Sequence, residues 1–257
     1  MKKVIFIAAS LLAIAACNKA VFNVQNEVGY LNFNLAADDI IVTTKVNVSD
    51  VELGNYTVYV GKTSYNYNEI KAKVLAIDSG TYDVYAENIT PDVAHTSNDG
   101  KGSLRLASDP QSIEVAAGQT SNVTLYCRAV NAKITVTFDD SFKTAFSSWG
   151  VTLGYENDNT RNKTVTNETS AQDAVFFYNI HKTIKNLAFA LSATPKHGGD
   201  AKTNTTTLPI QAGYHYTVKY SAGTSGYVNI TVTAEDSLND GGTTTVPVNP
   251  YAPEQNS

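Results

Sequence analysis

This sequence of 257 residues has no long hydrophobic run and no concentration of charge of one sign. The apolar stretch Val4–Ala16 spans 13 residues, whereas a helix needs roughly 20 apolar residues to cross a bilayer, so a membrane span is disfavoured. The formal net charge is −5, and the chain has no basic run. This mild acidity argues against nucleic acid or an anionic membrane surface as the partner.

Cysteine and histidine are scarce, and neither shows the spacing of a catalytic or metal site. Two cysteines are present, and the four histidines lie at positions 95, 181, 197 and 215. No HxxxH or HExxH spacing, GxSxG elbow or GxGxxG loop occurs. Adjacent carboxylates on a strand point to opposite faces, so we interpret Asp38-Asp39 and Asp139-Asp140 as turn residues. We therefore expect no enzymatic activity, no metal site and no cofactor.

The chain begins with the layout of a secretory signal. Lys2 and Lys3 precede the apolar stretch, which ends in Ile14-Ala15-Ala16-Cys17. These four residues resemble the bacterial lipobox, in which the cysteine receives a lipid and becomes the mature N-terminus. We expect a signal peptide at residues 1–16 and lipidation at Cys17, since more than one acyl chain gives stable anchoring. An ordinary signal peptide that happens to lie beside a cysteine is the alternative.

Removal of this signal peptide has two consequences. The net charge changes from −5 to −7, because Lys2 and Lys3 are lost. With Cys17 lipidated, Cys127 has no partner for a disulfide within the chain. Cys127 is in phase with Val123 and Leu125, so we expect a small buried hydrophobic side chain rather than a reactive thiol.

Alternation of apolar and polar residues with period two recurs along the chain and predicts β-strands. No stretch shows a convincing helical period. One apolar and one polar face per strand is typical of antiparallel sheets packed as sandwiches, so the pattern predicts an all-β fold. The expected inward-facing residues are Leu31, Phe33, Leu35, Tyr56, Val58, Val60, Tyr82, Val84, Ala86, Ile134, Val136, Phe138, Leu187, Phe189, Leu191, Tyr214, Tyr216, Val218, Tyr220, Val228, Ile230 and Val232.

An internal echo indicates two such domains. Val115-Ala-Ala-Gly118 parallels Ile210-Gln-Ala-Gly213 at an offset of 95, and Ile134-Thr-Val-Thr137 parallels Ile230-Thr-Val-Thr233 at an offset of 96. An offset of this size is that of a whole sandwich domain and is too long for a solenoid repeat. The strand at 134–137 either closes the first domain or opens the second.

We therefore divide the chain into five segments. They are a signal peptide at 1–16, an anchor linker at 17–27, β-sandwich domains at 28–129 and 130–236, and an extended or disordered tail at 237–257 in which Thr243–Val248 is a possible edge strand.

Several stretches resemble a known family. The lipobox, Gly29–Leu35, Gly80–Ala86 and the join Val123–Phe138 resemble an uncharacterised family of Bacteroides-type lipoproteins related to the fimbrillin-like proteins. The resemblance covers about residues 29–235. It implies two tandem transthyretin/immunoglobulin-like antiparallel β-sandwich domains on an envelope lipoprotein. Fimbrillin-like members are pilus subunits, pilus anchors or tip adhesins, which implies that the partners are pilus subunits or other envelope or host surface proteins.

Two departures from the fimbrillin-like scheme affect assembly and orientation. Residues 18–104 contain no arginine, so no site for the arginine-specific protease that trims pilus precursors lies early in the first domain. The mature start Cys17-Asn-Lys-Ala lacks an acidic export cluster, which leaves a periplasm-facing orientation open. We expect a lipid-anchored protein of the outer membrane, exposed at the cell surface, that acts as an adhesin or as a pilus anchor or tip component.

Tyrosine is abundant and gives a second functional hypothesis. Tyr65 and Tyr67 lie in a predicted loop after a strand, and Tyr59, Tyr85 and Tyr126 lie on the apparent outer face. A tyrosine ring offers an apolar body and a polar tip to a glycan or protein, although scattered surface tyrosine is ordinary in β-proteins. Tyr65 and Tyr67 are thus candidate contact residues of a glycan-binding lipoprotein that works beside an outer-membrane importer.

Overall fold

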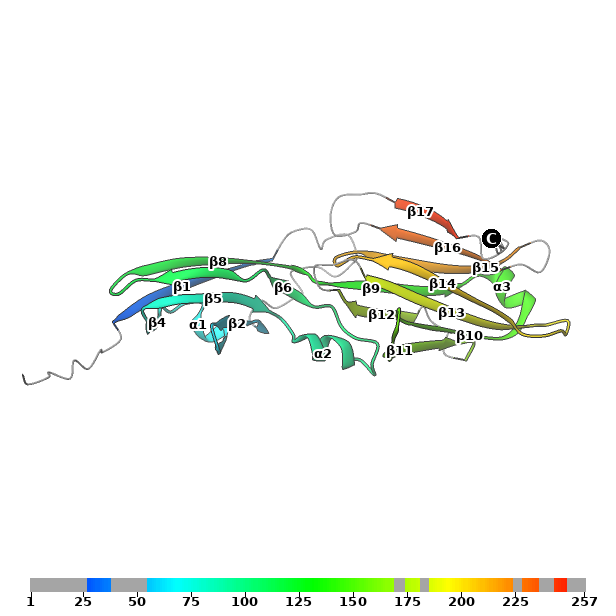
Figure 1. The fold of residues 1–257 in the computed structure, drawn as a ribbon, viewed down its shortest axis with the longest axis horizontal. Helices are drawn as coiled ribbons and strands as arrows, with labels where there is room; N and C mark the ends of the chain where they lie inside the picture. Colours follow the sequence, from blue (N-terminus) through cyan, green and yellow to red (C-terminus); the bar gives the residue numbers. More distant parts are fainter. Residues whose placement is uncertain are drawn as a thin grey trace, which may run out of the picture.

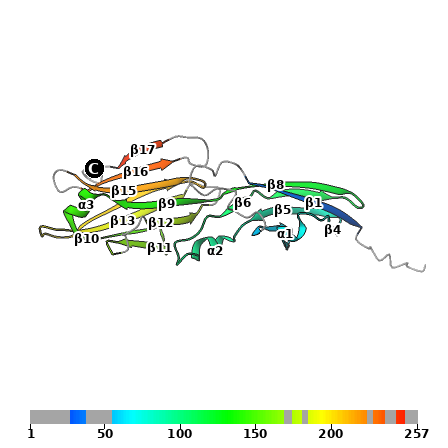
Figure 2. The same ribbon diagram turned by 180° about the vertical axis from the view of Figure 1, so that it is seen from behind.

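The computed structural model describes residues 27–37, 55–168, 174–180, 185–223, 228–235 and 243–248 (Figure 1). The predicted signal peptide, Cys17, Asp38-Asp39 and the tail apart from Thr243–Val248 lie outside the described residues. The described chain forms an elongated body of strands in two halves placed end to end, which Figure 2 shows from behind.

The first half, up to residue 129, contains one hydrogen-bonded sheet. Its strands follow the order β3-β2-β5-β6-β8-β1-β4, and β7 pairs with β5. The short β6 links the two parts of the sheet, because it pairs with β5 on one side and with β8 on the other. The elements are β1 (Val28–Ala37), β2 (Thr57–Val60), β3 (Thr63–Asn66), α1 (Tyr67–Ile70), β4 (Leu75–Asp78), β5 (Gly80–Glu87), α2 (Pro91–Thr96), β6 (Leu106–Ser108), β7 (Gln111–Val115) and β8 (Thr120–Ala129).

The second half, from residue 131, has two sheets with the strand orders β11-β10-β13-β14 and β12-β9-β15-β16-β17. The side chains between the two sheets form its core. The elements are β9 (Asn131–Phe138), α3 (Asp140–Ala145), β10 (Phe146–Tyr155), β11 (Asp158–Thr166), β12 (Ala174–Asn179), β13 (Lys185–Pro195), β14 (Lys202–Ile210), β15 (His215–Ala222), β16 (Val228–Glu235) and the edge strand β17 (Thr243–Val248).

The predicted inward-facing residues form two separate cores, one in each half. All of them are buried except Tyr82 and Tyr214, which are partly buried and pack against their respective cores. The predicted all-β, sandwich-like fold is therefore confirmed.

Two strand pairs differ from the antiparallel arrangement that alternation predicts. β1 runs parallel to β8, and β9 runs parallel to β15. These pairs account for the glycine part of the internal echo, whereas the two Ile-Thr-Val-Thr stretches lie in β9 and β16, and only β16 pairs with the strand before it. Gly118 and Gly213, with φ of 70° and 85°, precede β8 and β15, and their amides donate to the carbonyls of Val28 and Asn131 at 2.8 and 2.9 Å. Glycine adopts positive φ readily, so the same tight entry to a parallel strand is built twice.

The strand at 134–137 lies within β9, which pairs with β12 and β15 of the second half. The chain leaves β8 at Ala129 and enters β9 at Asn131, so a single residue, Val130, separates the two strands. A connection this short holds the last strand of one half close to the first strand of the next.

Three short helices were not expected from the sequence. α1, α2 and α3 are only 4 to 6 residues long, which is too short for a helical period to be visible. Each begins at a capping side chain, namely Asn66, Thr90 or Asp139. The Asp139 carboxylate accepts from the Phe142 amide at 3.0 Å, which is how this predicted turn residue starts α3. In the described residues, no helix has the length and hydropathy of a membrane span.

Candidate functional site

The outer face of the first half carries a row of three tyrosines on β2, β5 and β8, with β6 between the last two strands. Tyr59 on β2 and Tyr85 on β5 are directly opposite in register, and their rings stack with centroids 4.5 Å apart. Tyr126 on β8 is 61% exposed. Glu87 and Arg128 are both opposite Ala107 on β6, so Tyr85 and Tyr126, each two residues earlier, lie at the same level of the sheet. The three tyrosines that the sequence assigned to an outer face therefore share one face.

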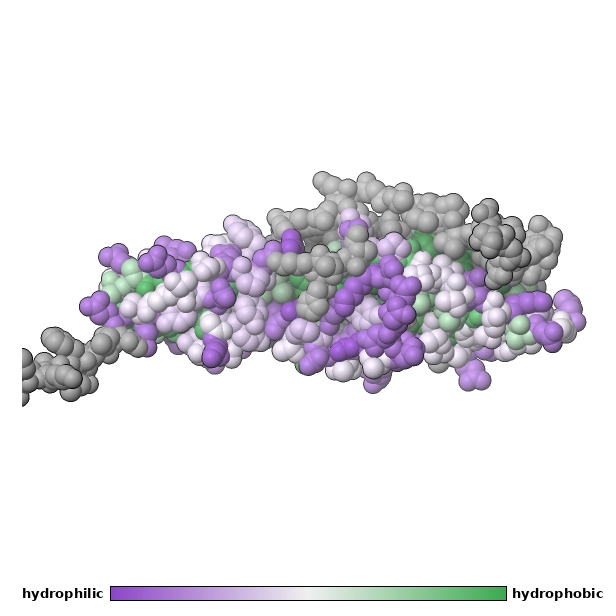
Figure 3. Space-filling model, in the orientation of Figure 1, coloured by the Kyte–Doolittle hydropathy of each residue, from purple (hydrophilic) through white to green (hydrophobic). Residues whose placement is uncertain are grey.

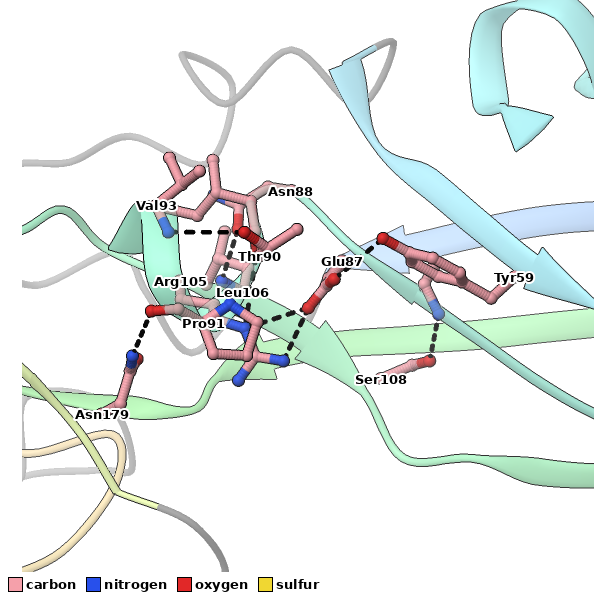
Figure 4. Close-up of polar contacts among 12 residues, drawn as sticks. Tyr59, Glu87, Asn88, Thr90, Pro91, Val93, Arg105, Leu106, Ser108 and Asn179 are labelled. Atoms are coloured by element: carbon pink, nitrogen blue, oxygen red, sulfur yellow. Dashed lines mark hydrogen bonds and ion pairs between the residues drawn. The ribbon is translucent and has the colours of Figure 1, made fainter. Parts of the chain in front are cut away.

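A buried ion pair lies beside this row. Arg105 donates from Nε and Nη2 to Oε2 of Glu87 at 3.0 and 2.6 Å (Figure 4), and the two side chains are 13% and 5% exposed. The Tyr59 hydroxyl donates to the other oxygen of Glu87 at 3.1 Å. Burial and the neighbouring Glu87 raise the pKa of Tyr59 to about 12, so the hydroxyl stays protonated as a donor. The carboxylate is thus held from two sides.

The same region ties the two halves together. The Arg105 amide donates to Oδ1 of Asn131 at 3.3 Å, and Asn131 Nδ2 donates to the Ser103 carbonyl at 2.8 Å. Asn179 of β12 donates to the Pro91 carbonyl of α2 at 2.6 Å (Figure 4). Two buried or partly buried amide side chains therefore bridge the halves, and we call this contact the junction.

At the junction, the backbone of the loop after α2 lies close to the backbone of β12. Gly102 has φ of 86°, and a Cβ atom there would lie 2.7 Å from the Ala94 carbonyl oxygen and 2.9 Å from that of Phe177. The Phe177 amide donates to the Lys101 carbonyl at 2.8 Å. Only glycine fits this combination of conformation and contact, so the loop after α2 is seated directly on β12.

His95 of α2 extends this contact into the second half. It is 5% exposed, and its ring centroid lies 6.0 Å from those of Tyr155 and Tyr178, stacked on the first and edge-on to the second. Both imidazole nitrogens are buried without a hydrogen-bond partner. The Tyr178 hydroxyl donates to the Leu153 carbonyl and the Tyr155 hydroxyl to the Asn179 carbonyl, and neither hydroxyl is hydrogen-bonded to His95. His95 therefore contacts the second half through its ring, which packs against Tyr155 and Tyr178, and we call this contact the His95 plug.

The His95→Phe variant is expected to be more stable than the wild type by about 1–2 kcal/mol, because it keeps the ring contacts and removes two unpartnered polar atoms. His95→Ala is expected to lower stability, since it leaves a cavity between Tyr155 and Tyr178. Denaturant unfolding of the three proteins measures both effects. Equal destabilisation by the two substitutions would show that the imidazole nitrogens carry a hydrogen bond.

The two tyrosines predicted as contact residues do not form a surface site. Tyr67 is the first residue of α1, is 8% exposed, and its hydroxyl accepts from the Leu35 amide at 3.1 Å. Tyr65 is partly buried and packs against the first core. The prediction of a surface role for Tyr67 is wrong, because the turn into α1, capped by Asn66, directs the ring inward.

Two of the remaining histidines have defined surroundings in the structure. His215 lies 2.8 Å from the Thr135 hydroxyl, His197 is exposed, and His181 is outside the described residues. Among the residues that the structure describes, no group of three His, Cys, Asp or Glu side chains is placed to hold a metal ion.

Cys127 is fully buried, and burial raises the pKa of its thiol to about 12, against a smaller lowering effect of a backbone hydrogen bond at Ser108. We therefore expect native protein at pH 8 to resist alkylation by iodoacetamide at Cys127 and to react once it is unfolded. Mass spectrometry of the modified protein tests this. Rapid labelling of the native state would mean that β8 is not held as described.

Sequence reasoning missed Glu87, Arg105 and Asn131. Glu87 ends a strand predicted to be half exposed, and its partner lies 18 residues further along the chain. One signal was present, since Arg105 is the first arginine after Cys17 and lies just before an apolar pair, Leu106 and Ala107. A lone arginine at the start of a buried strand needs a carboxylate or several carbonyls as partners.

Comparison with solved structures gives likenesses in fold. A fimbrial assembly protein from Parabacteroides distasonis is 12% identical with a TM-score of 0.41, covering 85% of this chain and 98% of that one. A candidate adhesin from Bacteroides thetaiotaomicron is 10% identical with a TM-score of 0.42, covering 87% and 98%. A candidate polysaccharide-binding protein from the same species is 7% identical with a TM-score of 0.43, covering 86% and 97%.

No curated protein matches the sequence. Residues 27–249 match a family described as a domain of unknown function, DUF4493. This match spans both halves and the junction between them. The predicted resemblance to an uncharacterised family is thereby confirmed, and the chain belongs to the DUF4493 family.

Proposed function

We propose that this protein is a lipid-anchored component of the cell envelope that works by surface contact, as an adhesin or as a pilus anchor or tip component. One observation carries the proposal: the two halves lie end to end in an elongated body, which we call the rod, and β1 begins at one tip of it. β1, which follows the predicted anchor at Cys17, starts at the far end of the first half (Figure 1). A lipid at Cys17 would tether this tip and leave the second half projecting.

The junction supports a role that depends on rigidity. The amide bridges from Asn131 and Asn179 and the His95 plug restrict rotation between the halves. Relative motion is the usual expectation for two domains that share only a polar interface. A rod that holds its distal half away from the membrane suits an adhesin or an anchor more directly than a hinged pair of domains.

The projecting half offers strand edges for protein contact. β11 and β14 are the outer strands of one of its sheets. A partner strand can add to such an edge through backbone hydrogen bonds. Lys202 and Pro209 on β14 are residues of the kind that limit edge pairing, so β11 is the edge of this sheet that remains for strand addition. We propose that pilus subunits or other envelope or host surface proteins bind here.

Genetic deletion tests this function. We expect a deletion strain to lose adherence to host surfaces or to lose pili, and we expect Cys17→Ser to reproduce the deletion because the protein is released from the membrane. Cys127→Ala is the matched control and should stay anchored to the membrane, since Cys127 is a buried side chain of the first core and lies outside the predicted lipobox. The proposal fails if purified protein stays monomeric, binds no host or bacterial surface, and deletion changes neither adherence nor pili.

A second function, glycan binding beside an outer-membrane importer, is favoured by the tyrosine row of Tyr59, Tyr85 and Tyr126. If it is correct, Tyr126→Ala should weaken polysaccharide binding about tenfold, the loss expected when one aromatic contact is removed. Tyr30→Ala, which removes an exposed tyrosine elsewhere on the same sheet face, is the control. Absence of binding across a polysaccharide panel would remove this alternative.

A further inference from the structure

Exposed apolar side chains gather at the end of the first half where β1 begins. Five large hydrophobic residues among the described ones are exposed, and three of them lie here, namely Val28 at 42%, Tyr30 at 38% and Val74 at 54%. Of the other two, Val93 lies on α2, and Tyr126 lies opposite Ala36, near the other end of β1. Figure 3 shows apolar surface, in green, at this end of the rod.

The strand register places these residues on one face. Val28 and Tyr30 alternate with the buried Gly29 and Leu31 on β1. Tyr30 is opposite Ala76 of β4, which is exposed, and the exposed Val74 directly precedes the first residue of β4. Val28, Tyr30 and Ala76 thus share one face of the β1–β4 pair, with Asp78 opposite Val28, and we call these three residues and Val74 the proximal patch.

The patch is close in the chain to the predicted lipid. Residues 18–27 separate Cys17 from Val28, and this segment reaches at most about 35 Å when fully extended. The patch is therefore confined to the neighbourhood of the bilayer that holds the lipid. Because the tether holds this exposed apolar surface near the bilayer, the surface can leave water by entering the bilayer.

The chemistry of the patch fits the interfacial region of a bilayer. Valine side chains gain by leaving water, and a tyrosine ring is favoured where its body is apolar and its hydroxyl is hydrated. Lys71 and Lys73 are exposed just before Val74, while Glu27 and Asp78 are exposed beside Val28. These charges nearly balance, and the whole chain is acidic, so attraction to anionic lipid is not what brings the patch to the membrane.

We propose that the proximal patch rests in the headgroup region of the bilayer to which Cys17 is attached. The inference depends on the lipidation in the proposed function and adds that the rod is seated on the membrane, with its first half in contact with lipid. The seat restrains the tilt of the rod and so directs the second half outward. The proximal patch contacts the lipid surface and not a second copy of the chain.

Site-specific labelling of the complete lipidated protein in phosphatidylcholine vesicles tests the inference. Val74→Cys introduces one reactive thiol, because Cys127 is buried and the Cys17 thiol is consumed by the lipid. Tyr126→Cys is the control, since Tyr126 is an exposed residue on the same sheet face outside the patch. Both positions are exposed, so neither substitution removes core packing.

An environment-sensitive fluorophore at position 74 is expected to be several-fold less accessible to an aqueous quencher in vesicles than in detergent, and to be quenched by lipid-borne nitroxide. The label at 126 is expected to show neither effect. Equal aqueous quenching at 74 and 126 in protein that floats with the vesicles overturns the seated patch and leaves the anchor intact. The label at position 74 could instead be protected from the aqueous quencher without vesicles, to a degree that grows with protein concentration. That result would assign the patch to a contact with a second copy of the chain and would overturn the lipid contact. Failure to float overturns the anchor and the inference together.

Discussion

Arg105→Met is expected to lower the free energy of unfolding by about 3–5 kcal/mol, the range found when one partner of a buried ion pair is removed. Glu87 would be left nearly enclosed, with the Tyr59 hydroxyl as its remaining side-chain donor. The cost is mainly that of an uncompensated buried carboxylate rather than of the lost contact. The guanidinium also donates to the Ile89 carbonyl at 3.2 Å, and that acceptor would lose its partner.

Two controls separate this explanation from general damage. The double variant Glu87→Met/Arg105→Met should recover most of the loss, because a buried pair replaced by apolar side chains leaves no bare charge. Arg128→Met should cost less than about 1 kcal/mol, since the Arg128–Asp109 pair at 2.9 Å is 57% and 51% exposed. Alkylation of Cys127 during denaturant unfolding reports on the first half. A double variant no better than Arg105→Met would contradict the charge argument.

Phe142→Ala is expected to destabilise the second half by about 3–5 kcal/mol, the usual cost of removing a buried aromatic side chain. Phe142 is 0% exposed and joins α3 to the core. Its ring lies 4.6 Å from that of Phe146 and 5.5 Å from that of Trp149. Loss of the ring would leave a cavity beneath α3 that these stiff neighbours cannot fill.

Fluorescence of Trp149, the single tryptophan of the chain, measures this unfolding directly. Lys143→Ala is the matched control, because Lys143 is an exposed neighbour on the same helix and its loss should change stability little. A wild-type transition in Phe142→Ala would mean that α3 is not packed on the core as described.

The core was predictable from the sequence because strand burial obeys a period of two. Leu31, Phe33 and Leu35 illustrate this, since each alternates with an asparagine or another exposed residue along β1. Nothing in that pattern reveals the direction of the neighbouring strand. The parallel pairing of β1 with β8 joins two strands at opposite ends of the first half of the sequence. The one local sequence signal of this pairing is Gly118, which precedes β8.

The candidate site was less predictable for two physical reasons. Tyr67 lies in a polar stretch that favours an exposed loop, yet a capped turn of helix directs its ring to the amide of Leu35. Glu87 and Arg105 are charged residues that local reasoning assigns to solvent. Their burial follows from the meeting of β5 and β6 at one register position, which only the folded sheet defines.

The central claim is that the rod is tethered to the envelope through Cys17. Mass spectrometry of the N-terminal peptide of the mature protein, isolated from the membrane fraction of the cells that produce it, tests this claim most directly. The account predicts that the first residue is Cys17 and that it carries thioether- and amide-linked acyl chains. A mature protein that begins at another residue, or at an unmodified Cys17, would contradict it.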